Sequence, residues 1–318
     1  MASAIGRRAL RLASQRRCFS STPARHAAEV KSLGVVGAGQ MGLGIALVAA
    51  QKAKVPVTLV DSSQASLDKG LAFAEKLLAK DVSKSRLTQE QADEARARLS
   101  PTTSLDTLSG VDFVIEAVPE VPELKFDVFA RLAEVCPAHA VLATNTSSIS
   151  ITKIAAAAAK SGKGAEAGSR VVATHFMNPV PVQKGVEIIS GLQTSAATLE
   201  AAVAFCGERM GKVASVSADS PGFLANRILM PYINEAIVCL ETGVGDRDAI
   251  DAIMRNGTNV PMGPLQLADF IGLDTCLAIM RVLHQETGDS KYRPSVLLTK
   301  MVDAGWLGKK SGKGFYDY

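Results

Sequence analysis

Long apolar runs are missing from this sequence of 318 residues, and no stretch approaches the roughly 20 residues that a membrane-spanning helix needs. Glycine, lysine or asparagine interrupts each of the longest apolar stretches, so we expect no membrane insertion. Cysteine is also scarce, with five residues and no Cys-x-x-Cys pair. Thiols spread this widely favour neither a zinc site nor a disulfide framework, so we expect no metal site and mostly buried, free cysteines.

Acidic residues are absent from the first 28 positions, which hold six arginines and no lysine. The chain has 35 basic residues in all, so the remainder carries 29 of them against 31 acidic residues. A nearly neutral body offers no basic surface, and we expect no nucleic-acid partner. The Arg- and Ser-rich composition of residues 1–28 is typical of a mitochondrial presequence, which predicts import into the mitochondrial matrix; a disordered tail is the alternative.

A glycine-rich turn joins the first apolar strand to a helix. The strand covers 33–36 and leads into Gly37-x-Gly39-x-x-Gly42, an alanine-rich helix follows, and a second strand ends at Asp61. Strand, glycines, helix, strand and acid in this order predict an α/β fold with a Rossmann-type dinucleotide-binding domain. The free N–H groups at the start of the helix would face the pyrophosphate.

The residue types of this motif suit their positions. Gly37 permits the tight turn, Gly39 lets the backbone approach the pyrophosphate, and Gly42 lets the helix pack against the strand. The Asp61 carboxylate would bind the adenine ribose hydroxyls and repel a 2′-phosphate, so NAD is favoured over NADP. The predicted cofactor-binding residues of this unit are Gly37, Ala38, Gly39, Gln40, Met41, Gly42 and Asp61.

Polar residues follow three further apolar runs, at the points where the predicted strands end. Glu120 follows the first of these runs, and Asn145 and Ser147 follow the second. His175 ends the third run. Because the ligand crevice of an open parallel sheet forms at the carboxyl ends of its strands, we expect these side chains to line one cleft.

A turn with two prolines separates His175 from the next apolar run, 186–189, which carries Glu187. Proline cannot donate to a sheet ladder, so this segment must turn between two strands. The turn can bring His175 and Glu187 together, and a histidine held by a carboxylate can take a proton from an alcohol near neutral pH. Spacing alone leaves a core histidine beside an unrelated glutamate equally open.

Residues 64–99 have the pattern of a charged, amphipathic helical stretch inserted after the second strand. Lys80 and Lys84 lie four residues apart and therefore on one helical face. That face could bind a polyanion. An ordinary solvated surface is the alternative, and it is the usual meaning of such spacing.

From residue 219 onward, helical patterns separated by glycines replace strand patterns. The apolar content of these helices exceeds what one small bundle needs, which predicts a homodimer through this part of the chain. The sequence thus divides into a presequence at 1–28, an NAD-binding Rossmann domain with an inserted helical hairpin at 31–216, and an all-helical domain at 217–318.

Taken together, the motifs resemble those of the 3-hydroxyacyl-CoA dehydrogenase family, from residue 31 to the end of the chain. The segments that carry the resemblance are GAGQMGLGIA (37–46), NTSS (145–148), HFMNPVPV (175–182), DSPGFLANRIL (219–229), PMGPLQLADFIGLD (261–274) and GWLGKKSGKGFYDY (305–318). The C-terminal segments look most like the short-chain, bacterial-type members that act on 3-hydroxybutyryl-CoA.

The resemblance implies roles for individual residues. His175 matches the family's catalytic histidine, Glu187 its partner carboxylate, and Asn226 its active-site asparagine. Ser147 matches the serine that contacts the substrate oxygen. Further positions match residues that contact the cofactor, namely Glu120, Lys125, Ser147, Asn178 and Lys310, or lysines near the CoA phosphates, namely Lys80 and Lys84.

The resemblance also implies the reaction, a reversible NAD-dependent oxidation of a (3S)-3-hydroxyacyl-CoA to the 3-ketoacyl-CoA with His175 as general base. One alternative is a dehydrogenase of a free hydroxy acid, which would not need Lys80 and Lys84. A non-catalytic NAD-binding relative is the other. Gln183 and Gly185 stand where the family usually has apolar residues, which bears on the acyl pocket rather than on the chemistry.

Overall fold

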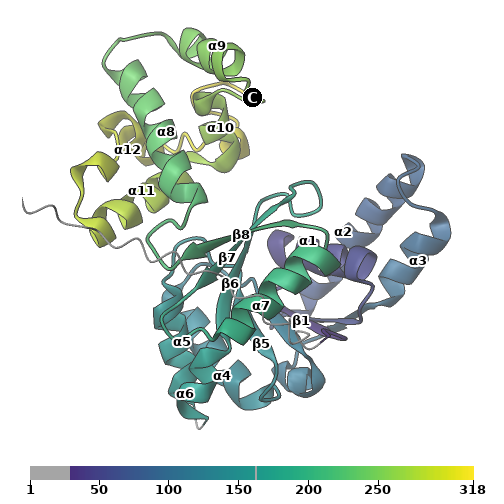
Figure 1. Cartoon of the computed structure of the whole chain (residues 1–318). Helices are drawn as coiled ribbons and strands as arrows, with labels where there is room; N and C mark the ends of the chain where they lie inside the picture. The colour runs from purple at the N-terminus through teal and green to yellow at the C-terminus, as the bar shows by residue number, and fades with distance from the viewer. Residues whose placement is uncertain (1–28, 162) are drawn as a thin grey trace, which may run out of the picture.

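The computed structural model describes residues 29–161 and 163–318, and the predicted presequence at 1–28 lies outside them. Figure 1 shows a sheet flanked by helices, with a helical bundle on one side and a helical hairpin on the other. The strands form one sheet in the order β3-β2-β1-β4-β5-β6-β7-β8. Their bounds are β1 (Leu33–Val36), β2 (Val57–Val60), β3 (Leu99–Thr102), β4 (Phe113–Glu116), β5 (Val141–Thr144), β6 (Val171–Phe176), β7 (Gly185–Ser190) and β8 (Val213–Ala218).

The sheet is parallel except between β6 and β7, which run antiparallel. Only the proline-containing turn at 177–184 joins these two strands, and so short a connection cannot return the chain to a parallel neighbour. The edge strands β3 and β8 have no counterpart in the sequence-based prediction. Most residues of β8 are exposed and β3 contains Pro101, so neither strand has the apolar run of a buried strand.

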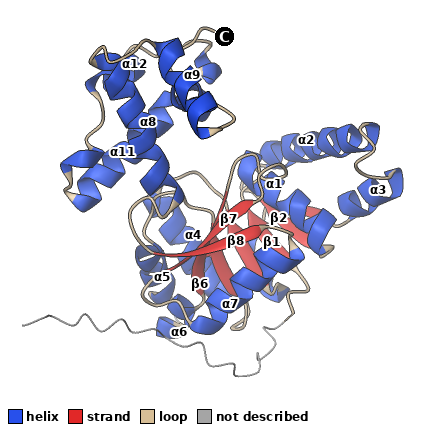
Figure 2. Cartoon of the chain, turned by 45° about the horizontal axis from the view of Figure 1, so that its top comes forward, coloured by secondary structure: helices blue, strands red, loops and turns tan. Residues whose placement is uncertain are grey.

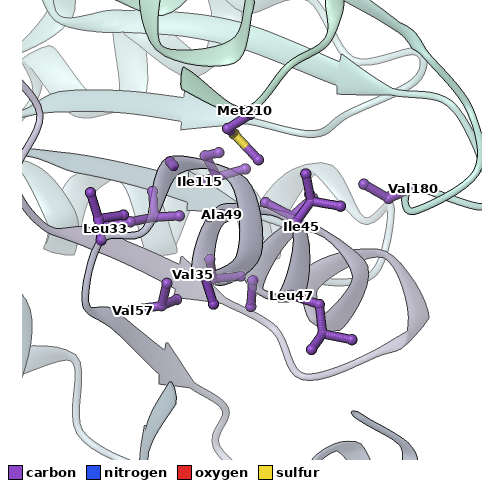
Figure 3. Close-up of a cluster of buried hydrophobic side chains, with 14 of the residues drawn as sticks. Leu33, Val35, Ile45, Leu47, Ala49, Val57, Ile115, Val180 and Met210 are labelled. Carbon is purple, nitrogen blue, oxygen red and sulfur yellow. The ribbon is translucent and has the colours of Figure 1, made fainter. Parts of the chain in front are cut away.

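Helices cover both faces of the sheet (Figure 2). Val35 joins a core with helical residues such as Ile45 and Ala49 on one face, which Figure 3 shows, whereas its neighbour Val36 packs on the other face. This alternation follows from the two-residue period of a strand. The first face carries α1 (Gln40–Val48), η1 (Ala49–Ala53), α7 (Ala196–Ala204) and η3 (Phe205–Arg209); the second carries η2 (Leu105–Gly110), α4 (Pro122–Val135), α5 (Ile151–Ala159) and α6 (Gly164–Ser169).

The stretch predicted as helical at 64–99 is a hairpin of α2 (Gln64–Ser83) and α3 (Gln89–Ala97), which projects from the body in Figure 1. Ser85 has a left-handed backbone (φ 55°) just after α2 ends. The Thr88 hydroxyl then accepts a hydrogen bond from the backbone N–H of Gln91, and the Gln91 side-chain oxygen accepts one from the backbone N–H of Thr88. A capping box of this kind starts a new helix, so one charged stretch becomes two helices.

The helical domain has its own core around α8, which packs against α10, α11 and α12. Gly272 (φ 104°) separates α10 from α11. The helices are α8 (Ala225–Glu241), α9 (Arg247–Thr258), α10 (Pro264–Ile271), α11 (Leu273–Thr287), η4 (Ser290–Tyr292), α12 (Val296–Asp303) and η5 (Lys309–Ser311). The predicted fold class, a Rossmann-type domain with a helical insertion followed by a helical domain, is confirmed. No helix of the described residues is long and apolar enough to cross a membrane.

Candidate active site

His175 and Glu187 face each other across the antiparallel pair of β6 and β7. The Nδ1 atom of His175 lies 2.8 Å from Oε2 of Glu187, and the two residues are only 9% and 5% exposed. Since an ionised carboxylate only accepts hydrogen bonds, Nδ1 donates and Nε2 keeps a lone pair for a proton. His175 is the last residue but one of β6, which continues to Phe176 rather than ending at the histidine.

The second oxygen of Glu187 is held from the helical domain. Its Oε1 accepts hydrogen bonds from the backbone N–H groups of Leu224 (2.8 Å) and Ala225 (2.9 Å), at the start of α8. Burial raises the pKa of the Glu187 carboxyl, but the hydrogen bonds from His175 and the two amides outweigh it and leave the pKa below its usual value. The carboxylate is therefore ionised at neutral pH and can stabilise an imidazolium.

Glu120 organises the loop that carries Ser147. Its Oε1 atom accepts from the backbone N–H groups of Ser147 (2.8 Å) and Ser148 (3.0 Å) and from the hydroxyls of Thr146, Ser147 and Ser148. Burial raises the pKa of Glu120, but the charge of Lys125 and these hydrogen bonds bring it below its usual value. An ionised Glu120 thus fixes the backbone around Ser147.

Lys125 is almost fully buried, with 1% of its surface exposed, between two carboxylates. Its Nζ atom lies 2.6 Å from Oε1 of Glu116 and 3.3 Å from Oε2 of Glu120. Burial raises the pKa of Glu116 despite the nearby Lys125 charge and the hydrogen bond from Thr144. The Lys125 ammonium thus faces Glu116 and Glu120, and the cofactor contact expected for it stays a prediction. Glu116 was not among the predicted site residues, although an acid inside an apolar strand is a signal for a buried, paired charge.

Two asparagines tie the Ser147 loop to its surroundings. The side chain of Asn226, on α8, donates to the carbonyl oxygen of Ser147 at 3.3 Å. Asn145 accepts from the backbone N–H of Phe176 at 2.8 Å, next to His175. The structure thus brings Ser147, His175 and Asn226 together where the sheet meets α8.

The glycine-rich turn has the space that a bound dinucleotide requires. Gly37 has φ 106°, and a side chain there would lie 2.6 Å from the carbonyl oxygen of Ala117. A side chain at Gly42 would collide with the carbonyl oxygen of Gly37, so α1 packs closely on the turn. Above Gly39, by contrast, no atom lies within 4 Å of where a side chain would begin. The turn is closed on its inner side and open toward a pyrophosphate, which fits NAD.

Asp61 lies beside this turn, at the end of β2. Its Oδ2 accepts from the backbone N–H of Ala38 at 2.8 Å, so the carboxylate is fixed next to the glycine-rich turn. Gln40 donates to the side chain of Asn178 at 3.1 Å, which links the first turn of α1 to the turn after β6. Met41 packs half-buried against the core of this face.

Lys310 lies apart from these residues. It belongs to η5 in the helical domain, where its Nζ forms an ion pair of 2.6 Å with Asp274 at the start of α11. Among the described residues it makes no hydrogen bond or ion pair to the sheet domain. The structure therefore does not bring Lys310 to the glycine-rich turn.

A groove of about 320 Å³ lies between α1, the inserted hairpin and the turn at 178–182. Its lining includes three cations, Lys52, Lys80 and Arg86. The one lining acid, Asp81, pairs with Arg86 at 3.4 Å. Lys84, the predicted partner of Lys80, ends α2 and does not line the groove. Helical spacing did not indicate Arg86, because on the predicted helix 64–99 it lies two residues from Lys84 and off the Lys80–Lys84 face; in the structure it follows α2 and lines the groove.

Gln183 lies in the turn before β7, and Gly185 is the first residue of β7. A side chain at Gly185 would meet only Met177, at 3.7 Å, so space does not require glycine there. Lys212 donates to the backbone carbonyl oxygen of Gln183 at 2.7 Å and also to that of Val180. The turn is thus held through its backbone, whichever side chains it carries.

An open glycine turn at the first strand and a histidine–carboxylate pair at the later strands define an NAD-dependent dehydrogenase. The family model for the 3-hydroxyacyl-CoA dehydrogenase NAD binding domain matches residues 32–220. The model for the C-terminal domain of the same family matches residues 222–318. The chain belongs to the 3-hydroxyacyl-CoA dehydrogenase family and is an NAD-dependent enzyme.

Individual relatives agree with this assignment. The chain is 50% identical to a probable 3-hydroxybutyryl-CoA dehydrogenase of Bacillus subtilis, over 91% of this chain and 98% of the relative. It is 50% identical to the 3-hydroxybutyryl-CoA dehydrogenase of Bradyrhizobium diazoefficiens, over 92% and 97%. The crystal structure of (S)-3-hydroxybutyryl-CoA dehydrogenase from Ralstonia eutropha superimposes with a TM-score of 0.85 at 44% identity, covering 91% of this chain and 99% of that one.

The predicted location in the mitochondrial matrix is contradicted by these comparisons. The relatives at 50% identity are proteins of bacteria, which have no mitochondria. The prediction depended on the arginines and the missing acids of residues 1–28, which lie outside the described residues. Composition alone does not distinguish a targeting segment from any other basic segment, so the predicted matrix location is wrong.

Proposed function

We propose that the enzyme oxidises short-chain (3S)-3-hydroxyacyl-CoA thioesters to 3-ketoacyl-CoA, reversibly, with 3-hydroxybutyryl-CoA as a favoured substrate. The main support is the buried His175–Glu187 pair, 2.8 Å apart, at the strand ends beside Ser147 and Asn226. The names of the relatives at 50% identity support the short chain. The cationic groove disfavours a free hydroxy acid as substrate, and the complete set of polar residues disfavours a non-catalytic relative.

In this proposal His175 is the general base. Its Nε2 takes the proton of the C3 hydroxyl, a contribution of typically ~10²–10⁴-fold. Glu187 keeps the proton on Nδ1 before the reaction and stabilises the imidazolium after it. Ser147 and Asn226 hold the C3 oxygen and the thioester carbonyl. NAD, when bound, supplies the acceptor for the hydride that leaves C3.

The cofactor-binding residues that we propose are those of the glycine turn, 37–42, together with Asp61 and Asn178. Glu120 completes the site at the nicotinamide end through the Ser147 loop that it holds. For Lys125 we propose a supporting role, because its ammonium faces Glu116 and Glu120. A contact between Lys310 and the cofactor stays a prediction of the family resemblance. In this structure the Lys310 ammonium forms an ion pair with Asp274.

For the CoA moiety we propose the groove beside the inserted hairpin. Lys80, Arg86 and Lys52 carry three positive charges against the single charge of Asp81. A 3′-phosphorylated ADP group has the opposite charge and several acceptor oxygens, whereas a free hydroxy acid has neither. Lys84 stands next to the groove and would contribute only long-range attraction.

We further propose two domains, 31–216 and 217–318, and a homodimer through the second. The strand β8 ends at Ala218, two residues past the first boundary. Most apolar residues of the helical domain lie in its core, but Ile228, Ile253 and Val296 are 70%, 66% and 56% exposed. Burial of such side chains against a second copy would stabilise a dimer. Light scattering tests this, since a mass of one chain at micromolar concentration would contradict the dimer.

The experiment that tests the proposed reaction compares wild type with His175→Gln. Oxidation of NADH would be followed with acetoacetyl-CoA, longer 3-ketoacyl-CoA thioesters and free acetoacetate. We expect the highest rate with acetoacetyl-CoA, little with acetoacetate, and loss of most turnover in His175→Gln while NADH still binds. Full activity of the variant, or equal rates with and without CoA, would overturn the proposal.

A further inference from the structure

The turn that joins the two domains contains an unusual backbone. Gly222 and Phe223 both have left-handed conformations, with φ values of 76° and 50°. Glycine adopts this region freely, but a phenylalanine adopts it only at an energetic cost. Because residue 223 is a phenylalanine and not a glycine, contacts of its side chain must offset the free-energy cost of the strained backbone.

What the side chain of Phe223 contacts is the imidazole of His175. The two ring centroids are 6.0 Å apart, with an angle of 60° between the ring planes, an edge-to-face arrangement. Phe223 is 3% exposed. The two residues that follow it, Leu224 and Ala225, donate their backbone N–H groups to Glu187. One short turn therefore holds both members of the pair.

The hydrogen bond to Glu187 does not by itself fix the tilt of the His175 ring. A single hydrogen bond from Nδ1 fixes that atom, but the ring can still tilt about the line that joins the two atoms. The tilt decides where the lone pair of Nε2 points, and a misplacement of about 1 Å can reduce a rate about 100-fold. The contact with Phe223 removes this freedom, because a ring packed on the imidazole blocks the tilt.

We propose that Phe223 is a positioning residue of the reaction, which sets the orientation of the His175 ring through the edge-to-face contact. The inference rests on the proposed role of His175 as general base. The turn packs closely on α11, since a side chain at Gly222 would lie 2.7 Å from Leu283. The orientation of His175, in the Rossmann domain, thus depends on the position of the helical domain, which carries Phe223.

The test compares Phe223→Leu with Phe129→Leu. Phe129 is fully buried in the same hydrophobic cluster, on α4, and has no aromatic contact with His175 among the described residues. Both variants exchange a buried phenyl ring for leucine, so both should lose stability. Only Phe223→Leu should lower the single-turnover rate of NADH oxidation with acetoacetyl-CoA, by about 3- to 10-fold, the range expected for one aromatic contact.

Three further readouts separate positioning from a structural role. The KM for acetoacetyl-CoA and the Kd for NADH should stay within about twofold of wild type in Phe223→Leu. Phe223→Tyr, which keeps the ring, should keep the rate. If Phe223→Leu does not fold, Phe223→Met takes its place. An unchanged rate in the folded leucine or methionine variant overturns this inference, whereas full activity of His175→Gln would overturn the proposed function beneath it.

Discussion

His175 and Glu187 are direct cross-strand neighbours in the single antiparallel pair of the sheet, with 2.8 Å between Nδ1 and Oε2. Side chains opposite each other in such a pair lie on the same face and start close together. The two residues are 12 positions apart in the sequence, yet their side chains are in direct hydrogen-bond contact. The geometry of the pair is thus a property of the sheet, and the amides of α8 complete it.

Replacing Glu187 by Gln should lower kcat by roughly 100-fold or more, the smaller end of a general-base contribution. The glutamine oxygen can still accept from Leu224 and Ala225. Its amide nitrogen would then donate to Nδ1 of His175 and move the imidazole proton to Nε2, where no base remains. Steady-state kinetics at saturating acetoacetyl-CoA would measure this. An exposed change such as Glu208→Gln serves as control, and a kcat equal to that of the control would make Glu187 structural.

The lowered pKa of Glu187 has a consequence for stability. A carboxyl group with a folded-state pKa below its unfolded value of about 4.5 contributes stability above that pH and loses it as the pH falls through the folded value. The free energy of unfolding in urea should therefore decline below about pH 4.5 more steeply in wild type than in Glu187→Gln. Parallel curves for the two proteins would contradict the assignment.

Lys80→Ala and Arg86→Ala should each raise the KM for acetoacetyl-CoA by about 10-fold, as expected from the loss of one charged hydrogen bond. The KM for the N-acetylcysteamine thioester, which lacks the ADP group, should not change. Lys84→Ala is the matched control, since it removes a lysine four residues from Lys80 but outside the groove. If Lys84→Ala has the larger effect, CoA lies along the outer face of α2 instead.

Lys125→Met should destabilise the protein by about 3–5 kcal/mol, because it leaves buried Glu116 without its counter-charge. The double variant Glu116→Gln/Lys125→Met should recover much of this loss, since it removes the unpaired charge as well. Urea unfolding of the single and double variants gives the comparison. A double variant less stable than Lys125→Met would mean that the ion pair is not the source of the loss.

Much of the sheet domain could be predicted from local pattern. The apolar runs of β1, β2, β4 and β5 are buried on both faces and bounded by turns, so their sequence is nearly continuous in apolar residues. The edge strands β3 and β8 were not predicted, because a partly exposed strand does not need a continuous run of apolar residues. The division of the inserted stretch into two helices was not predicted, although Thr88 and Gln91 have the spacing of the capping box that starts α3.

The candidate site also has a part that the sequence predicted and a part that it could not. Strand ends and turn prolines predicted where Ser147, His175 and Glu187 would gather. They could not predict that Lys125 would be enclosed by Glu116 and Glu120, because a buried charge is recognised only once its surroundings are known. The location inferred from residues 1–28 was wrong for a related reason, since composition without context carries little information.

The sequence by itself determined the dinucleotide turn, the sheet class and the chemical identity of the proton-accepting pair, because glycines, apolar periods and a histidine are local properties. The tertiary structure alone decided how that pair is held. Glu187 accepts hydrogen bonds from backbone N–H groups at the start of α8, the first of them 37 residues further along the chain. His175 packs against Phe223 in the turn between the domains. Those contacts join segments distant in sequence, and only packing of the whole chain brings them together.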